Sequence, residues 1–249
     1  MVRTLLIRGM LVGILAGVLG FAFAWLLGEP QVDIAIAFED HMHQIAGDPP
    51  DPVLVSRAVQ STVGLFTGVV VYSCALGGIF ALVFAYAYGR LGRLSPRATA
   101  AILAAAGLVV LILVPQIKYP ANPPSIGNPA TIDSRTALYF GMIACSVIAA
   151  VASLMLGRSV RSRLDNWNAT LIGGGVYVVA MLIVMLVLPP VNEVPADFSA
   201  ATLWAFRLVS FGINVVVWTT LGLAFGALTQ RHLEPRIRYS VRSRFAGSA

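Results

Sequence analysis

Six apolar stretches, each about as long as a membrane-spanning helix, divide this chain of 249 residues. A helix needs about 20 predominantly apolar residues to cross the hydrocarbon core of a bilayer. Hydrophobic residues make up 58% of the chain and charged residues 11%, whereas a soluble domain carries about a quarter charged residues. We therefore expect an all-α, polytopic membrane protein, a bundle of six transmembrane helices near residues 5–27, 61–88, 98–117, 136–156, 169–188 and 203–228.

The connections between these stretches alternate in charge. The termini and the second and fourth connections hold 13 of the 17 Lys and Arg residues, and the other three connections hold 9 of the 11 Asp and Glu residues. Because short basic loops stay in the cytoplasm, both termini are expected to be cytoplasmic and the acidic connections to face outward. Residues 1–228 are then one transmembrane domain, followed by a basic cytoplasmic tail at 229–249. The net charge of +6 is assigned to topology and lipid headgroups, not to nucleic acid.

Prolines and a cleavage-like motif bear on the helix ends. Ala22-Phe23-Ala24 resembles a signal-peptidase site, but the run from Leu5 to Leu27 is long enough to span, so we expect a retained helix. That helix is expected to end at Gly28-Glu29-Pro30. The third and fifth helices run into Pro115 and Pro189, which cannot continue a helix cheaply.

The first outward connection, from Gly28 to Arg57, is the most acidic and holds two of the three histidines. Imidazole and carboxylate are the usual ligands of divalent first-row metals. The candidate metal ligands here are Glu39, Asp40, His41 and His43. In a helix, Glu39 and His43 share a face, whereas in an extended stretch His41 and His43 do. A solvated acidic surface with two incidental histidines is the alternative.

Polar residues in the other two outward connections could complete the site. The amide and carboxylate oxygens of Asn122, Asn192 and Glu193 suit a hard or borderline cation. Asn128, Asp133 and Asp197 are further candidates, although both aspartates precede expected helices and could be helix caps. Arg207 lies just inside the sixth stretch, where it either pairs with Glu193 or Asp197 or anchors the helix alone.

Two kinds of internal repetition stand out. Glycines recur every four residues, a spacing that lets helices pack closely in lipid and leaves open a homo-oligomer, at Gly9, Gly13 and Gly17, at Gly64 and Gly68, and at Gly222 and Gly226. The third and fifth connections are both rich in proline, contain asparagine, and lead through a threonine to an arginine, Arg135 or Arg207. The chain could therefore be three related helical hairpins, or the likeness could be coincidence among proline-rich turns.

Several classes of activity are disfavoured. The chain contains no phosphate-binding loop and no dinucleotide-binding fingerprint, so any uphill transport would draw on an ion gradient or another subunit. No HExxH or GxSxG motif is present either. No Asp, Glu, Lys, Arg or His lies deep in the expected spans, which argues against a self-contained proton antiporter. We expect neither an enzyme nor a bound cofactor.

Several segments resemble the CbtA family of bacterial cobalt transporter subunits. They are residues 35–39, 55–60, 64–68, 119–124 with 131–136, and 192–195 with 203–207. The likeness runs to about Leu228, and its most specific part is Tyr119-Pro120-Ala121-Asn122-Pro123-Pro124. The resemblance implies a multi-pass protein of the bacterial inner membrane that takes up cobalt beside a small one-helix partner, CbtB, which carries histidines near one end.

The sequence thus predicts the membrane subunit of an importer for cobalt or a similar divalent ion. The acidic first connection would capture the ion, and Asn122, Asn192 and Glu193 would line the outer mouth. The alternative is a non-transporting membrane adaptor or assembly partner that binds a protein through its outer loop.

Overall fold

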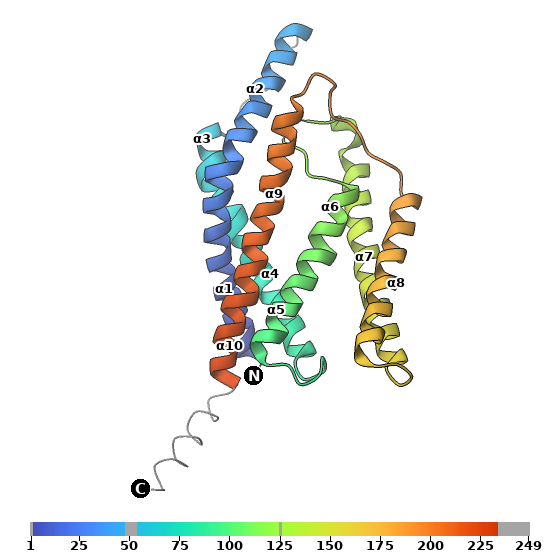
Figure 1. Cartoon of the computed structure of the whole chain (residues 1–249). Coiled ribbons are helices and arrows are strands. Elements are labelled where there is room, and N and C mark those ends of the chain that lie inside the picture. The colour runs from blue at the N-terminus through green and yellow to red at the C-terminus, as the bar shows by residue number, and fades with distance from the viewer. Residues whose placement is uncertain (1, 48–53, 125, 234–249) are drawn as a thin grey trace. The chain divides into compact units, whose positions relative to one another are not determined.

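The computed structural model describes residues 2–47, 54–124 and 126–233, and all regular structure within them is helical (Figure 1). Six continuous helices are long and apolar enough to cross a membrane, in agreement with the sequence prediction. They are Val2–Ala46, Arg57–Ala87, Pro96–Lys118, Pro129–Val160, Asn166–Val187 and Ala200–Leu233. Residues 229–233 of the predicted basic tail belong to the last helix, and residues 234–249 lie outside the described residues.

The first helix does not end at Gly28-Glu29-Pro30, so that prediction is wrong. It runs as α1 (Val2–Phe23), a π-helical segment η1 (Ala24–Gly28) and α2 (Glu29–Ala46). A proline ring normally clashes with the carbonyl four residues earlier. Here the amide of Glu29 bonds to the carbonyl of Ala24, five residues back, and this wider turn lets the helix continue through Pro30. The continuous helix has 45 residues, far more than the roughly 20 that span a bilayer.

The third helix also continues through a proline that follows a π-helical turn. It consists of α5 (Pro96–Gly107), the π-helical segment η3 (Leu108–Leu113) and α6 (Val114–Lys118), so Pro115 lies inside the helix. The fifth helix, α8 (Asn166–Val187), does stop before Pro189, as predicted. A proline therefore ends a helix here only where no π-helical turn precedes it.

The described residues fall into two compact units. Unit 1 comprises Met1–Glu29, Pro52–Ala106 and Gly212–Ala249, and unit 2 comprises Pro30–Asp51 and Gly107–Phe211. The remaining helical segments are α3 (Arg57–Val59), η2 (Gln60–Gly64), α4 (Leu65–Ala87), η4 (Pro129–Thr131), α7 (Ile132–Val160), α9 (Ala200–Thr220), η5 (Leu221–Phe225) and α10 (Gly226–Leu233).

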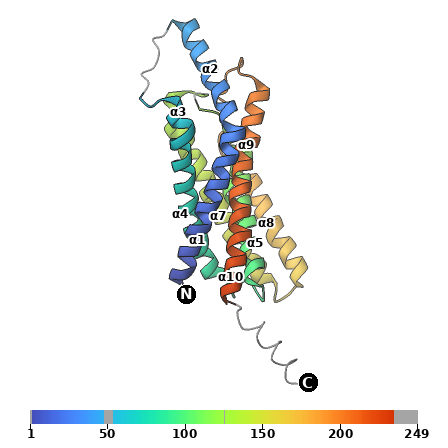
Figure 2. The same ribbon diagram turned by 90° about the vertical axis from the view of Figure 1, so that its left-hand side faces the viewer.

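In unit 1, α1 packs closely along α4 (Figure 2). The glycines of α1 make this possible: an added Cβ would lie 2.6 Å from Ala81 Cβ at Gly9, 2.9 Å from Cys74 Cα at Gly13 and 2.8 Å from Val70 Cα at Gly17. Contacts that short are not tolerated, so the helix backbones approach as near as glycine allows. The first glycine ridge is therefore an internal packing surface.

The second and third glycine pairs differ. An added Cβ at Gly222 or Gly226 would lie 2.8 or 3.1 Å from Ala104 or Ala100 of α5, so this pair also serves internal packing. Among the described residues, no atom lies within 4 Å of an added Cβ at Gly68, and at Gly64 only the backbone of Val59, one turn earlier, does. An oligomer contact along this pair stays a prediction.

In unit 2, α7 and α8 run side by side (Figure 1). A buried cluster joins Met142 of α7 and Met181 of α8 to Val114 of α6 and to Tyr119, the residue after α6. A second cluster joins α2 to the two proline-rich connections: Ala35 and Phe38 of α2 pack with Ile126 and Phe198. The Phe38 and Phe198 rings meet edge to face with centroids 5.2 Å apart. This cluster fixes α2 against the segments that carry the candidate ligands.

Candidate functional site: the proline-rich end of unit 2

The four candidate ligands of the first connection, Glu39, Asp40, His41 and His43, lie on the last turns of α2. Because α2 is helical from Glu29 to Ala46, Glu39 and His43 share a face, whereas His41 points about 200° away from His43. Glu39 and His43 are half-buried, and Asp40 and His41 are exposed. Of the two arrangements that the sequence left open, the structure has the helical one.

These side chains do not form a complete metal site by themselves. Within residues 2–47, 54–124 and 126–233, no group of three or more His, Cys, Asp or Glu side chains is placed to hold a metal ion. Glu39 and His43 can together offer two ligands, so other ligands would have to come from water or another molecule. Asp48 and Asp51, the last acids of this connection, lie outside the described residues.

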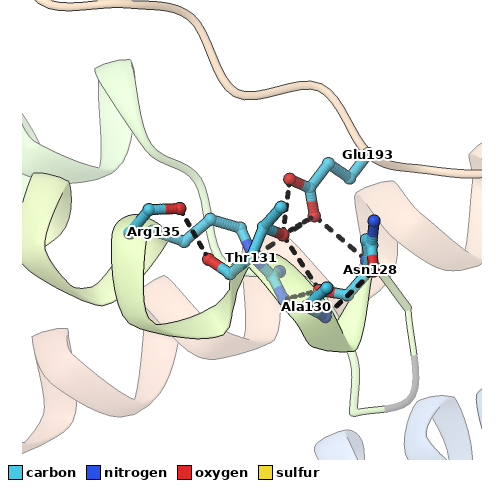
Figure 3. A network of polar contacts seen from close by, with 6 residues as sticks. Asn128, Ala130, Thr131, Arg135 and Glu193 are labelled. Atoms are coloured by element: carbon cyan, nitrogen blue, oxygen red, sulfur yellow. Dashed lines mark hydrogen bonds and ion pairs between the residues drawn. The ribbon is translucent and has the colours of Figure 1, made fainter.

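The remaining predicted ligands lie in two connections that we call the proline-rich end of unit 2, residues 119–131 and 188–199. Glu193 reaches from the second of these onto the first turns of α7 (Figure 3). Its two carboxylate oxygens lie 2.7 and 2.8 Å from the hydroxyl of Thr131, and its Oε2 accepts a 3.0 Å hydrogen bond from the amide of Asn128. These neutral donors fix the position of the carboxylate.

Arg135 supplies the charge that balances Glu193. Its Nε lies 3.3 Å from Glu193 Oε2, as an ion pair that lacks the direction of a hydrogen bond. Its Nη2 donates a 3.1 Å hydrogen bond to the carbonyl of Asn128. The guanidinium also lies against Gly127, where an added Cβ would be 2.7 Å from Arg135 Nη1. Gly127 has a φ of +129°, which few other residues tolerate.

The pKa of Glu193 lies below its ordinary value. The main cause is the hydrogen bond from Thr131, followed by the hydrogen bond from the Asn128 amide, and the charge of Arg135 contributes least. Burial acts in the opposite direction but does not outweigh these bonds. The carboxylate is therefore ionised at neutral pH, as a cation ligand must be.

Arg207 contacts the other proline-rich connection, and the predicted pairing with Glu193 or Asp197 is not what the structure shows. Its Nη2 donates a 2.9 Å hydrogen bond to Asn122 Oδ1, and its Nε donates to the carbonyl of Ala121 at 3.2 Å. Glu193 pairs with Arg135 instead. Asn122 is half-buried, and Asn192 is exposed beside Glu193.

The two aspartates predicted as caps have other positions. Asp133 lies within the first turn of α7, whose N-cap residue is Thr131. Before α9, Ser199 accepts a 3.4 Å hydrogen bond from the amide of Thr202, and Asp197 is exposed two residues earlier. Asp133 still stabilises α7, because its negative charge lies near the positive end of the helix dipole.

Three further contacts at helix ends were not found from the sequence. Lys118 donates a 2.7 Å hydrogen bond to the carbonyl of Met185 in the last turn of α8, and the Tyr119 hydroxyl donates to the carbonyl of Pro189 at 2.8 Å. In unit 1, Arg57 pairs with Glu29. A lone Lys or Arg at the end of a span indicates anchoring, but nothing in the sequence identifies the carbonyl or carboxylate that it meets.

Comparisons with known proteins agree with the resemblance noted from the sequence. Searches of curated proteins and of solved structures found no match. The family described as "Probable cobalt transporter subunit (CbtA)" matches residues 2–230, which is most of the chain. A transporter family of this kind implies a protein that is not an enzyme. The chain is therefore a multi-pass membrane protein that belongs to the CbtA family of probable cobalt transporter subunits.

Proposed function

We propose that this chain imports cobalt or a similar divalent ion, with both termini in the cytoplasm of a bacterium and the acidic connections outside its inner membrane. The charge distribution supports the orientation, because basic residues are concentrated at the termini and in the second and fourth connections. The observation that carries the proposal is the ionised, positioned carboxylate of Glu193 beside Asn192, in a chain that belongs to a cobalt transporter family.

Ion capture is assigned to the end of α2. Carboxylates on a helix that extends beyond the span raise the local cation concentration by simple attraction. Glu39 and His43 on one face can hold an ion in two of its coordination positions, while Asp40 and His41 add attraction from the other faces. Such incomplete coordination suits a site from which the ion must leave again.

The outer mouth is assigned to the proline-rich end of unit 2. Asn122, Asn192 and Glu193 offer two amide oxygens and a carboxylate, and water can fill the remaining coordination positions of a borderline cation. The cluster of Ala35 and Phe38 with Ile126 and Phe198 ties α2 to the same connections. An ion released from α2 would then have a short path to the mouth.

Partners follow from the same proposal. The lipid bilayer covers the exposed apolar residues of the spans, and a small one-helix subunit of the CbtB type would bring further histidines. A homo-oligomer would use the glycine pair Gly64 and Gly68, because an added Cβ at either position meets no other helix within 4 Å in the described part of the chain. The basic residues at 229–249 would contact anionic lipid headgroups on the cytoplasmic side.

Uptake of radioactive cobalt tests the function. Cells that lack their own cobalt importers would express this chain with and without a one-helix partner, and uptake would be measured at limiting Co²⁺. Wild type should exceed an empty vector, and Glu193→Gln should reduce uptake to the vector level. Asp165→Asn, at the N-cap of α8 in the second of the basic connections, is the matched control and should keep wild-type uptake. Wild-type uptake equal to the vector in both backgrounds contradicts the proposal.

A non-transporting adaptor is the second candidate. It is favoured by the exposed end of α2, where Ile45 is 68% exposed, and by the lack of a three-ligand metal cluster within the described ranges. An adaptor would leave cobalt uptake unchanged on deletion of residues 39–46 but would lose a co-purifying protein. An importer would lose uptake at limiting metal instead.

A further inference from the structure

Two of the proposed ligands at the mouth already contact a positively charged side chain of the protein itself. Glu193 faces Arg135, and Asn122 accepts from Arg207. Each arginine comes from the helix that follows one proline-rich connection and reaches the other connection. Arg135 follows residues 119–131 and meets Glu193, whereas Arg207 follows residues 188–199 and meets Asn122. A cation that enters the mouth therefore meets ligands that already face positive charge.

Arg135 is not what holds Glu193 in place. The carboxylate is positioned by Thr131 and by the amide of Asn128, and those bonds do not involve the guanidinium. The Arg135 contact is a 3.3 Å ion pair without hydrogen-bond direction, and both side chains are partly exposed. Removing the guanidinium should therefore leave a positioned carboxylate with one positive neighbour fewer.

Arg135 also keeps other contacts when another cation binds Glu193. Its Nη2 bonds to the carbonyl of Asn128, and its guanidinium fits over Gly127, where no side chain blocks it. The arginine would thus remain close to the carboxylate and could return to it. Its competition with a bound ion is intramolecular, so its effective concentration is high and independent of the medium.

We propose that Arg135 sets the affinity threshold of the mouth: it is a tethered cation that competes with the transported ion for Glu193. This inference rests on the proposed function, since it assumes that Glu193 contacts the ion. A monovalent ion brings no more charge than the guanidinium and does not displace it. Mg²⁺ and Ca²⁺ bring two charges but bind carboxylate mainly by attraction, whereas Co²⁺ also forms stronger bonds to oxygen and nitrogen ligands. Arg135 therefore raises the affinity for Glu193 that an ion needs in order to occupy the site.

Metal binding by the detergent-purified full chain tests the inference, with Co²⁺ and Mg²⁺ titrated separately by calorimetry at pH 7. Arg135→Gln should tighten Co²⁺ binding roughly twofold to fivefold, as expected for loss of a partly exposed ion pair. It should tighten Mg²⁺ binding by the same factor, because either ion must displace the guanidinium before it can bind Glu193. Arg135→Lys keeps the charge and should behave as wild type. Arg161→Gln, an exposed arginine at the other end of α7, is the matched control and should change neither affinity.

Glu193→Gln, alone and combined with Arg135→Gln, completes a double-mutant cycle. It should weaken Co²⁺ binding, and adding Arg135→Gln to it should then have no further effect. The inference is overturned if Arg135→Gln leaves both affinities within twofold of wild type, if Glu193→Gln binds Co²⁺ as wild type does, or if wild type and Arg135→Gln both fail to bind. Cobalt binding with this mutational pattern in a chain that shows no uptake would contradict the transport function alone.

Discussion

The hydroxyl of Ser146 on α7 donates a 2.7 Å hydrogen bond to the carbonyl of Val110 in the preceding helix. Val110 lies in the π-helical segment η3, where the amide of Val114 bonds to Val109 and not to Val110. The next residue, Pro115, has no N–H to offer. Ser146 therefore satisfies a carbonyl that its own helix leaves without its usual partner, and the hydroxyl of Tyr177 lies 2.8 Å from the same serine.

Replacing Ser146 with alanine should destabilise the protein, because the Val110 carbonyl would be left unpaired in an apolar environment. Ser146 is fully buried, and an unsatisfied buried polar group costs about 1–3 kcal/mol. The free energy of unfolding, measured by titration with a denaturing detergent, should fall by that amount. Tyr177→Phe is the control: it removes one hydroxyl but leaves the bond to Val110, so its effect should be smaller. Equal losses in the two variants would contradict this account.

Gly13→Ala should destabilise unit 1, because the new methyl group would lie against the backbone of α4 at Ser73 and Cys74. Overpacking of this kind costs about 1–3 kcal/mol. Gly68→Ala is a matched control on the facing helix, since nothing lies within 4 Å of its added Cβ. Thermal unfolding in detergent should show a lower midpoint for Gly13→Ala alone. A lower midpoint for Gly68→Ala as well would instead indicate a contact of that glycine with another molecule.

The six spans were predictable because burial in lipid requires long apolar runs, and such runs are visible without any knowledge of tertiary structure. Their ends were not all predictable. The rule that proline ends a helix holds at Pro189 but fails at Pro30 and Pro115, where a π-helical turn removes the clash. That turn has no simple sequence pattern, so the continuity of the helix through Pro30 could not be expected.

The candidate site was predictable in its residue types but not in its pairings. Asparagine and glutamate beside proline-rich turns indicated where oxygen ligands gather, and the likeness of the two connections pointed to Arg135 and Arg207. Which arginine meets which ligand depends on how the two connections pack, and no local sequence pattern predicts that packing. Of the roles considered for Arg207, neither pairing with Glu193 or Asp197 nor anchoring alone named Asn122, the residue that it contacts.

The stability contributed by Glu193 should depend on pH. Because its hydrogen bonds to Thr131 and Asn128 lower its pKa below the ordinary 4.5, its contribution is fully present above that value. It should be lost as the pH falls through the lowered pKa. Thermal midpoints of wild type and Glu193→Gln should therefore differ by a constant amount between pH 7 and about pH 5 and converge in more acidic solution. A difference that grows on acidification would contradict the assigned hydrogen bonds.

The helical state of α2 predicts which histidine matters for metal capture. Glu39 and His43 share a face and can contact one ion, whereas His41 points away from both. His43→Ala and Glu39→Ala should each weaken Co²⁺ binding to the end of α2 by at least about tenfold, because even loss of a residue that only orients a ligand costs about that much. His41→Ala removes the same imidazole from the exposed face and should have little effect. The visible absorption of Co²⁺ in the purified protein measures the three affinities. A loss that is equal for His41→Ala and His43→Ala would require the last turns of α2 to unwind on binding, because only an extended chain places those two imidazoles on one side.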